Sequence, residues 1–162
     1  LEFVSAETGS LRLDRKKTAT QQLFSSIPEG IAKTAEARQV KFDFRIEARE
    51  ISCDERQMRN VFRRLMHNAA KFSFTGSTVK VIGQTLEGGS YLLKIENEGP
   101  SIDAQRIHQL LKPFTLNENV MNHSSGTGLG WSICQGILKL HGSGLKIDSK
   151  GSEIQISFEL NS

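Results

Sequence analysis

The amino-acid sequence predicts one α+β domain, in which a layer of helices packs on a largely antiparallel sheet. Three observations lead to this prediction. First, the chain has 162 residues, and single domains commonly span about 100–200 residues. Second, segments with helical spacing of apolar residues are mixed with segments in which apolar and polar residues alternate, without the strict β-α-β order of a parallel sheet. Third, short glycine-containing turns join neighbouring alternating segments, as they do in hairpins.

The composition excludes several classes of protein. Apolar residues make up 37% of the chain, which is enough to fill one core and argues against disorder. No apolar run approaches the roughly 18 residues that a transmembrane helix needs, so we expect no membrane contact by this segment. The net charge of +3, from 21 Lys and Arg against 18 Asp and Glu, is too small to indicate a nucleic-acid-binding protein. With only two cysteines, Cys53 and Cys134, a disulfide scaffold is excluded and a reducing compartment is expected.

The N-terminal part of the chain is predicted to contain one kinked helix and one strand. Residues 1–7 have the pattern of a helix end that Gly9 stops, because glycine readily adopts the left-handed cap conformation. Between residues 18 and 38, apolar or small residues recur every four positions, which predicts a helix with a kink at Pro28. Residues 40–47 alternate between apolar and charged side chains, which predicts a half-buried strand. A basic cluster before the helix is interpreted as a solvated linker and consists of Arg12, Arg15, Lys16 and Lys17.

Residues 55–72 are predicted to form a long helix with three faces, and Asp54 is a favourable N-cap residue for it. An apolar stripe faces the core and consists of Met58, Phe62, Leu65, Ala69 and Phe72. A basic face is interpreted as solvated, with docking of a partner as the alternative, and consists of Arg56, Arg59 and Arg63. The third face holds Arg64, Asn68 and Lys71, at the border between the core and a cleft. By themselves these three residues have an ordinary structural explanation.

The rest of the chain is predicted to alternate between hairpins and helices. Asp103 is the expected N-cap of a short helix that Pro113 stops, and Gly142 closes a longer one. The predicted elements are strands at 78–86 and 90–97, helices at 103–111 and 129–141, and strands at 145–148 and 154–160.

Two glycine-containing segments are candidates for ligand binding. Residues 126–130 read Gly-Thr-Gly-Leu-Gly and precede a helix, so their amides could face an anion such as phosphate; a flexible hinge is the alternative. The run is neither a Walker loop, which needs Lys-Ser or Lys-Thr after the last glycine, nor a dinucleotide fingerprint, which follows a strand. Residues 97–102 read Asn-Glu-Gly-Pro-Ser-Ile at a strand end, where a tight turn is the alternative.

Together, and in this order, four segments resemble the motifs of one family, the ATP-binding catalytic domain of sensor histidine kinases. This domain is part of the GHKL superfamily, with type II topoisomerases and chaperone ATPases. The segment His-Asn-Ala-Ala-Lys-Phe at residues 67–72 resembles its asparagine box. Residues 97–102 resemble its first glycine box, the segment Lys-Pro-Phe at 112–114 its phenylalanine box, and residues 126–130 its second glycine box.

The resemblance implies a Bergerat-type ATP-binding fold, which is a two-layer α/β sandwich with helices on one face of a mixed, mostly antiparallel sheet. Residues 1–10 would be the end of a dimerisation helix and its linker, and residues 11–162 the catalytic domain. Residues 115–125 would form a mobile lid over the nucleotide, with Phe114 anchoring its base.

ATP and Mg²⁺ are the implied cofactors. Asn68 would bind Mg²⁺ through its side-chain oxygen, and Lys71 would offset phosphate charge. Asn97 would accept a hydrogen bond from the adenine amino group, and Gly99 would let the backbone approach the ring. The glycines of the second box would let the lid hinge while their amides reach the phosphates. The full implied nucleotide-binding set, with Asn68 as the metal ligand, is Asn68, Lys71, Asn97, Gly99, Ile102, Gly126, Thr127, Gly128, Leu129 and Gly130.

Several positions depart from the common pattern of the family. Asn97 stands where aspartate is usual, and a neutral acceptor makes a weaker hydrogen bond than an ionised one. Arg64 stands at a usual asparagine near the phosphates, where it either adds a cation or obstructs the metal. Further departures, which lower the expected catalytic efficiency more than they affect the fold, are Ser101, Leu111, Ser125 and Trp131.

The implied activity is that of a histidine protein kinase, which transfers the ATP γ-phosphoryl group to a histidine nitrogen in two-component signalling. No histidine precedes His67. The acceptor is therefore expected outside the chain, on the dimerisation and phosphoacceptor domain of the same protein, and no catalytic residue is assigned within it. A response regulator is the second implied partner. His67 could contact the cleft, whereas the remaining histidines are expected at the surface or at caps: His108, His123 and His141.

Two other functions stay open at this point. The first is a degenerate kinase-like module that binds ATP weakly or not at all and signals through conformation and protein partners. The second, a protein serine kinase similar to the anti-sigma-factor group, is disfavoured by the helix-like residues 1–7. The segment is expected in the cytoplasm, on a parent that is either attached to a membrane or free, and as a monomer or a weakly associated species.

Overall fold

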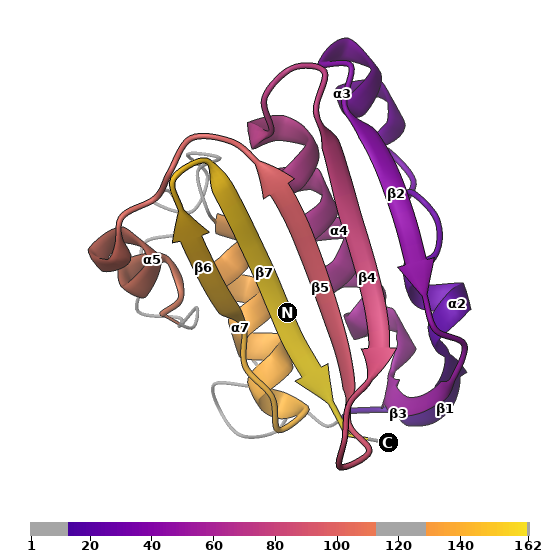
Figure 1. Cartoon of the computed structure of the whole chain (residues 1–162). Helices are drawn as coiled ribbons and strands as arrows, with labels where there is room; N and C mark the ends of the chain where they lie inside the picture. The colour runs from indigo at the N-terminus through magenta and orange to yellow at the C-terminus, as the bar shows by residue number, and fades with distance from the viewer. Residues whose placement is uncertain (1–12, 113–128, 162) are drawn as a thin grey trace.

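The structure is a computed structural model of the chain, and it describes residues 13–112 and 129–161. Its helices and strands are arranged as shown in Figure 1. They are β1 (Arg15–Ala19), α2 (Thr20–Phe24), α3 (Ala32–Ala37), β2 (Lys41–Ile46), β3 (Glu50–Asp54), α4 (Glu55–Phe72), β4 (Thr78–Thr85), β5 (Tyr91–Glu98), α5 (Ala104–Leu110), α7 (Leu129–Leu140), β6 (Lys146–Lys150) and β7 (Glu153–Leu160). Within the described residues, no helix has the length and apolar character needed to cross a membrane.

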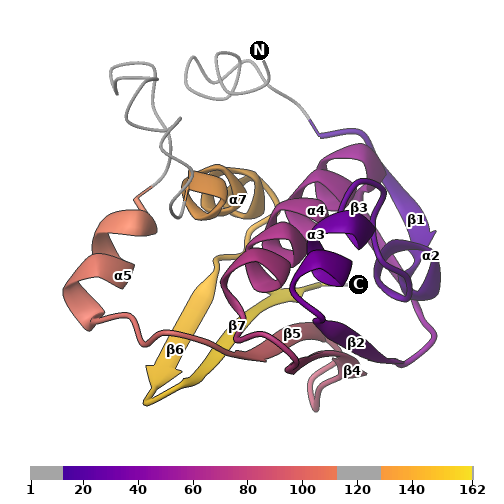
Figure 2. The same ribbon diagram turned by 90° about the horizontal axis from the view of Figure 1, so that it is seen from above.

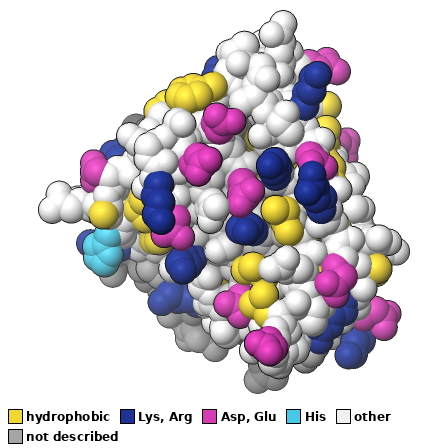
Figure 3. Space-filling model, viewed as in Figure 1, with side chains coloured by type: hydrophobic (Ala, Val, Ile, Leu, Met, Phe, Trp, Pro, Cys, Tyr) yellow, Lys and Arg dark blue, Asp and Glu magenta, His cyan; other side chains and the backbone are white. Residues whose placement is uncertain are grey.

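A five-stranded sheet forms one layer of the molecule, with the strand order β2-β4-β5-β7-β6. β2 and β4 are parallel, and the other neighbours are antiparallel. Helices α4 and α7 lie side by side on one face of this sheet, as Figure 2 shows from above. Acidic and basic side chains are interspersed on the opposite face (Figure 3). The predicted α+β fold, with helices on one face of a mixed, mostly antiparallel sheet, is confirmed.

A second, two-stranded sheet was not predicted. β1 pairs with β3 in antiparallel register, with Arg15 opposite Asp54 and Thr18 opposite Ile51. The interpretation of residues 15–17 as a solvated linker is therefore wrong for their backbone, although Lys16 is exposed. β1 contains a single buried residue, so its sequence lacks the alternation that identifies a strand. Backbone pairing with β3 decides its conformation.

The predicted kinked helix between residues 18 and 38 is two short helices, α2 and α3. Pro28 lies in the non-helical connection between them, where its missing N–H and its ring are tolerated. Ile27 is 40% exposed, so it is not part of the continuous apolar stripe that the four-residue spacing predicts. Gly30, with φ of 90°, takes the left-handed conformation that turns the chain towards α3.

Helix α4 is confirmed with its predicted bounds. The Asp54 side chain accepts a hydrogen bond from the backbone N–H of Gln57 at 3.1 Å, which satisfies one of the free amides at the helix start. The predicted apolar stripe is buried except for Phe72, which is half-buried. A second buried row, which the sequence analysis did not single out, consists of Val61, Met66 and Ala70. The helix is buried on two sides because it packs against both the sheet and α7.

The contact between α4 and α7 includes a buried thiol. The Cys134 Sγ lies 3.6 Å from the Val61 carbonyl oxygen, to which its S–H can donate. Burial raises the pKa of Cys134 to about 12, so the thiol stays protonated and unreactive near neutral pH. Cys53 and Cys134 are both free thiols, in agreement with the exclusion of a disulfide scaffold.

The later predicted elements are confirmed, and each of their bounds lies within two residues of the prediction. The Asp103 side chain accepts from the Arg106 N–H at 2.8 Å and caps α5. Gly88 and Gly89, with φ of 97° and 98°, form the turn between β4 and β5. The final hairpin consists of β6 and β7. β7 pairs with β5, and β6 forms the edge of the sheet.

His141 directly follows the last residue of α7, at one of the two kinds of position predicted for it, a cap, but it is buried and not at the surface. Its side chain is 4% exposed. The Nε2 atom accepts a hydrogen bond from the Asp54 N–H at 3.1 Å, and Nδ1 lies 3.0 Å from the Ile137 carbonyl oxygen, to which it donates. Both contacts require the neutral ring with its proton on Nδ1. His141 therefore connects the end of α7 to the start of α4.

Stability is expected to fall at mildly acidic pH because of His141. Burial lowers the pKa of this group from its ordinary value of 6.5. The unfolded chain therefore takes up a proton that the folded chain does not, so the stability is complete above about pH 6.5 and falls as the pH drops towards the folded-state pKa. Urea unfolding at pH 7.5 and 5.5 measures this difference. The variant His141→Asn should lose the pH dependence in this window, whereas His108→Gln, at an exposed position, should retain it. If the free energy of unfolding changed by the same amount between pH 7.5 and 5.5 in the wild type and both variants, His141 would not be the source of the pH dependence.

Candidate functional site

A pocket of about 220 Å³ lies where α4, α5, α7, β7 and the end of β5 meet. Its walls are mainly apolar and include Phe72, Ile102, Leu110, Trp131, Ile154 and Ile156, with the charged residues Asp103 and Arg106 also in the lining. Two amide side chains, Asn68 from α4 and Asn97 from β5, also line it. An apolar cavity with a few polar groups is the usual form of a site for a small organic ligand.

Asn97 is held in place by the end of α4. It lies on the buried side of β5, on the same face as Ile95, and is 7% exposed. Its Nδ2 donates a hydrogen bond to Ser73 Oγ at 3.0 Å, and Ser73 Oγ donates to the Ala69 carbonyl oxygen. This chain of donors fixes the amide orientation, so Oδ1 is the atom that can accept a hydrogen bond from a ligand.

Asn68 carries a buried polar atom that lacks a partner. Its Nδ2 makes no hydrogen bond within the described part of the chain. Leaving such a donor buried and unpaired costs about 1–3 kcal/mol. An unpaired amide on the wall of a pocket is explained if a bound ligand completes its hydrogen bonds.

The start of α7 lies against Asn68 and Arg64. A Cβ atom placed on Gly130 would lie 3.4 Å from Asn68 Nδ2 and 3.2 Å from Arg64 Cβ. A side chain at this position would require Arg64 to shift by a few tenths of an ångström, so glycine allows the close approach without such a shift. This approach brings the first turn of α7, where backbone amides lack intrahelical acceptors, next to the two polar residues of α4.

The predicted site residues are only partly brought together. Asn68, Asn97 and Ile102 line the same pocket, and Gly130 lies beside Asn68. Gly126, Thr127, Gly128 and the side chain of Leu129 lie outside the described residues, as do Phe114 and the predicted lid at 115–125. Nucleotide binding by this set stays a prediction.

Two predicted residues have other contacts. Lys71 is exposed and is not among the described residues that line the pocket; its Nζ lies 5.4 Å from the centre of the Phe72 ring. Gly99 packs against the last turn of α4, where an added Cβ would lie 2.5 Å from the Phe72 carbonyl oxygen. The close approach at Gly99 is thus between two parts of the backbone.

Several residues that line the pocket were not predicted from the sequence. Arg106 and Leu110 come from α5, and Ile154 and Ile156 come from β7. The alternation in β7 identified its two isoleucines as core residues and gave no sign that they border a cavity. No signal in the sequence connects α5 to this site, because their contact depends on packing alone.

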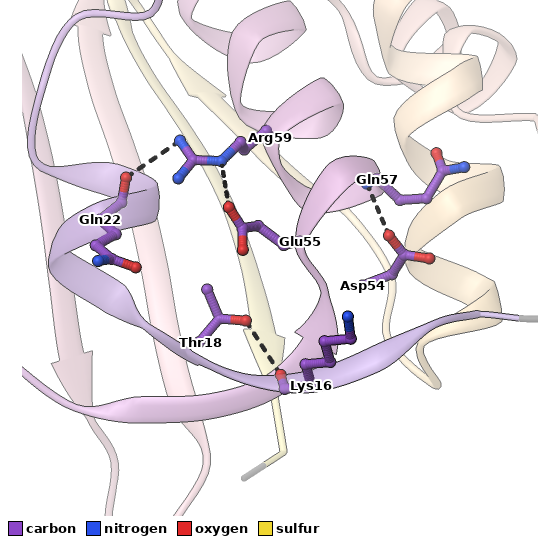
Figure 4. A network of polar contacts seen from close by, with 7 residues as sticks. All are labelled: Lys16, Thr18, Gln22, Asp54, Glu55, Gln57 and Arg59. Atoms are coloured by element: carbon purple, nitrogen blue, oxygen red, sulfur yellow. Dashed lines mark hydrogen bonds and ion pairs between the residues drawn. The ribbon is translucent and has the colours of Figure 1, made fainter.

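A wider polar hollow, of about 890 Å³, borders the N-terminal half of α4, from Asp54 to Arg64. Figure 4 shows the polar contacts at its far end: Arg59 pairs with Glu55 at 3.0 Å and donates to the Gln22 carbonyl oxygen at 3.3 Å. Arg59 and Glu55 are half-exposed, which fits the interpretation of this face as solvated. Arg63 and Arg64 form the end of the hollow that lies nearest Asn68 along the helix.

A metal ion would have few protein ligands here. The described residues contain no group of three or more His, Cys, Asp or Glu side chains that could hold a metal. An amide oxygen such as that of Asn68 fits a hard cation that keeps most of its waters, as Mg²⁺ does when phosphates supply the other ligands. The residues present are therefore compatible with Mg²⁺ bound together with a phosphate-containing ligand.

Comparison with known proteins gives one consistent result. Residues 53–162 match the family described as histidine kinase-, DNA gyrase B-, and HSP90-like ATPase. The sensor histidine kinase YvrG of Bacillus subtilis is 26% identical over 93% of this chain and 27% of its own length. The structure of the Acinetobacter baumannii histidine kinase AdeS has a TM-score of 0.80 at 21% identity, and covers 99% of this chain and 73% of that chain.

A further solved structure, full-length ShkA in complex with AMPPNP, has a TM-score of 0.80 at 17% identity. It covers 98% of this chain and 33% of that chain. The matches cover 17–30% of the length of the curated relatives.

Proposed function

Because the chain belongs to the histidine kinase-, DNA gyrase B- and HSP90-like ATPase family and matches the catalytic ATPase domain of sensor histidine kinases, we propose that its pocket binds ATP with Mg²⁺ for phosphoryl transfer to a histidine. The observation that carries the proposal is the shared pocket of Asn68 and Asn97. These residues come from different motifs and different elements. Their convergence on one apolar cavity is what an ATP site of this family requires.

Different residues of the pocket would bind different parts of the nucleotide. The apolar walls, with Ile102 and Trp131, would receive the base, and Asn97 Oδ1 would accept a hydrogen bond from an exocyclic amino group. Asn68 would direct its amide oxygen to Mg²⁺ and its Nδ2 to a phosphate oxygen. Mg²⁺, when bound, would neutralise phosphate charge and orient the terminal phosphate. Phosphoryl transfer depends mainly on such positioning and electrostatics, so the chain needs no covalent nucleophile of its own.

The rest of the assignment follows from this activity. We assign residues 11–162 to the catalytic domain and residues 1–10 to the end of a dimerisation helix and its linker. The phosphoacceptor domain of the same protein and a response regulator are its proposed partners, and the cytoplasm is its proposed location. The lid at 115–125 and the phosphate contacts of Lys71 and the second glycine box belong to the same proposal.

A nucleotide titration tests the proposal. Trp131 is the single tryptophan of the chain and lines the pocket, so its fluorescence should report binding. ATP with Mg²⁺ is expected to bind with a micromolar Kd, at least about tenfold more tightly than GTP, because guanine places a carbonyl oxygen opposite the acceptor Asn97. The variant Asn97→Leu should lose this preference. Equal binding of both nucleotides would contradict the proposed orientation of the base.

One observation favours the degenerate module as a second candidate. The predicted phosphate-binding residue Lys71 contacts Phe72 and lies outside the pocket. A domain that keeps its native circular dichroism and shows no response to ATP would support this alternative. Formation of acid-labile phosphohistidine in the full-length parent would exclude it.

A further inference from the structure

Arg64 is a half-buried cation at the seam between α4 and α7. It lies one helical turn before Asn68, and its Cβ is 3.2 Å from the position of a Cβ on Gly130. Its Nε donates a hydrogen bond to Asn60 Oδ1 at 3.1 Å. This contact uses one of the five N–H groups of the guanidinium and holds the side chain along the helix. The other four are the groups that can bind a ligand.

Among the described residues, Arg64 forms no ion pair with a carboxylate. Burial, together with the neighbouring Arg63, lowers the pKa of Arg64. The positive end of the twelve-residue helix α7 also lies here, next to Gly130. Two guanidinium groups and the positive end of a helix thus lie close together, and a bound anion would stabilise this arrangement.

Two buried N–H groups on the wall of the neighbouring pocket also lack acceptors among the described residues. Asn68 Nδ2 and Trp131 Nε1 are both buried and make no hydrogen bond to any described residue. Trp131 is 5% exposed and lies in the first turn of α7, directly after Gly130. Asn68 thus adds an unpaired donor to the guanidinium and the start of α7 at the seam, and Trp131 adds another in the adjoining pocket. Carboxylates also line the two cavities: Asp103 lines the pocket, and Asp54 and Glu55 line the hollow at the N-terminal end of α4.

We propose that Arg64 binds the phosphate tail of the nucleotide and supplies a fixed positive charge there, so that nucleotide binding by this domain depends only weakly on Mg²⁺. The proposal rests on the proposed function, because it places the base in the pocket of Asn68 and Asn97. A tail that leaves this pocket past Asn68 meets Arg64 about 5–6 Å further along the helix, where the wide polar hollow begins. A guanidinium binds two phosphate oxygens at once and keeps its charge at any physiological pH.

Calorimetric titrations with ATP, in Mg²⁺ and in EDTA, test the proposal. The wild-type domain is expected to bind ATP in EDTA within about fivefold of its affinity in Mg²⁺. The variant Arg64→Asn should lose about 10- to 100-fold in EDTA, which is the usual effect of one charge-assisted contact. Its loss in Mg²⁺ should be smaller, because the metal then supplies positive charge. Arg64→Lys, which retains the charge, should recover part of the affinity.

Arg63→Asn is the matched control, because Arg63 is exposed and contacts the same Asn60 Oδ1 at 3.0 Å. It should change the affinity in EDTA by less than about threefold, as expected for a solvated charge. Native circular dichroism of each variant shows that the fold is kept. Equal affinities of wild type and Arg64→Asn in EDTA, or ATP binding only in Mg²⁺, would overturn the role of Arg64.

Titration with inorganic triphosphate separates this proposal from the proposed function. If triphosphate binds through Arg64 but ATP is not preferred over GTP, the phosphate role of Arg64 stands and the base assignment fails. If ATP binds with the expected base preference and Arg64→Asn has no effect in EDTA, the base assignment stands and the Arg64 proposal fails. Absence of binding by both compounds overturns both.

Discussion

Replacement of Asn68 by leucine is expected to weaken binding of Mg·ATP by about 10- to 100-fold without lowering the stability of the fold. Binding is lost because the variant has neither the amide oxygen for Mg²⁺ nor the Nδ2 donor for phosphate. Stability is kept because the present Nδ2 is buried and unpaired within the described residues. Removing an unsatisfied donor in favour of an apolar group of similar shape is neutral or stabilising, by up to about 1 kcal/mol.

The opposite signs of these two effects distinguish a binding residue from a structural one. Calorimetry with Mg·ATP measures the affinity, and urea unfolding without nucleotide measures the stability. The control His67→Leu changes the neighbouring exposed residue of α4 and should alter the affinity by less than about threefold. If Asn68→Leu lowers the stability by more than about 2 kcal/mol, then Asn68 has a structural role and the argument from its unpaired amide fails.

Replacement of Gly99 by alanine is expected to lower the free energy of unfolding by about 2–3 kcal/mol, which lowers Tm by roughly 4–12 °C for a domain of this size. The new Cβ would lie 2.5 Å from the Phe72 carbonyl oxygen. Neither part of the backbone can move away freely. The Gly99 N–H donates to the Ser152 carbonyl oxygen at 2.9 Å, and the Phe74 N–H donates to the Glu98 carbonyl oxygen at 2.8 Å.

Gly144→Ala is the matched control for this variant. A Cβ at Gly144 would meet only Gln135 Oε1, at the ordinary contact distance of 3.6 Å. The control should therefore change the stability by less than about 1 kcal/mol, with stabilisation possible through the unfolded chain. Thermal unfolding of both variants checks the comparison. Equal Tm values for Gly99→Ala and the wild type would show that the end of β5 can move relative to α4, and that Asn97 is less firmly positioned than we infer.

Elements with a strong local signal could be predicted from the sequence. Helix α4 has a good N-cap at Asp54 and an apolar stripe over five turns, and its bounds were correct. The pair β4 and β5 has alternating residues around a glycine turn. The errors lie where the local signal is short or ambiguous. α2 and α3 share a four-residue spacing that Pro28 interrupts, and β1 becomes a strand only through its pairing with β3.

For the candidate site, too, some features could be predicted from the sequence and others became visible only in the structure. The order of the asparagine and glycine motifs was sufficient to select Asn68 and Asn97 and to indicate the family. The sequence analysis left open whether Arg64 adds a cation or obstructs the metal, and it placed Lys71 with the phosphates. The seam with Gly130 and the contact of Lys71 with Phe72 became visible only in the structure.

The sequence by itself therefore determined the fold class, the main helix, the hairpins and the identity of the motif residues, because each of these depends on neighbours within a few turns or one strand pair. Only the tertiary structure decided that Asn68 and Asn97 line one pocket, that α5 and β7 complete its wall, and that His141 is buried against the start of α4. These contacts join residues that are far apart in the chain. They depend on how α4 and α7 pack on the sheet. That packing is decided by the volume and shape of the side chains, which the periodicity of a sequence does not record.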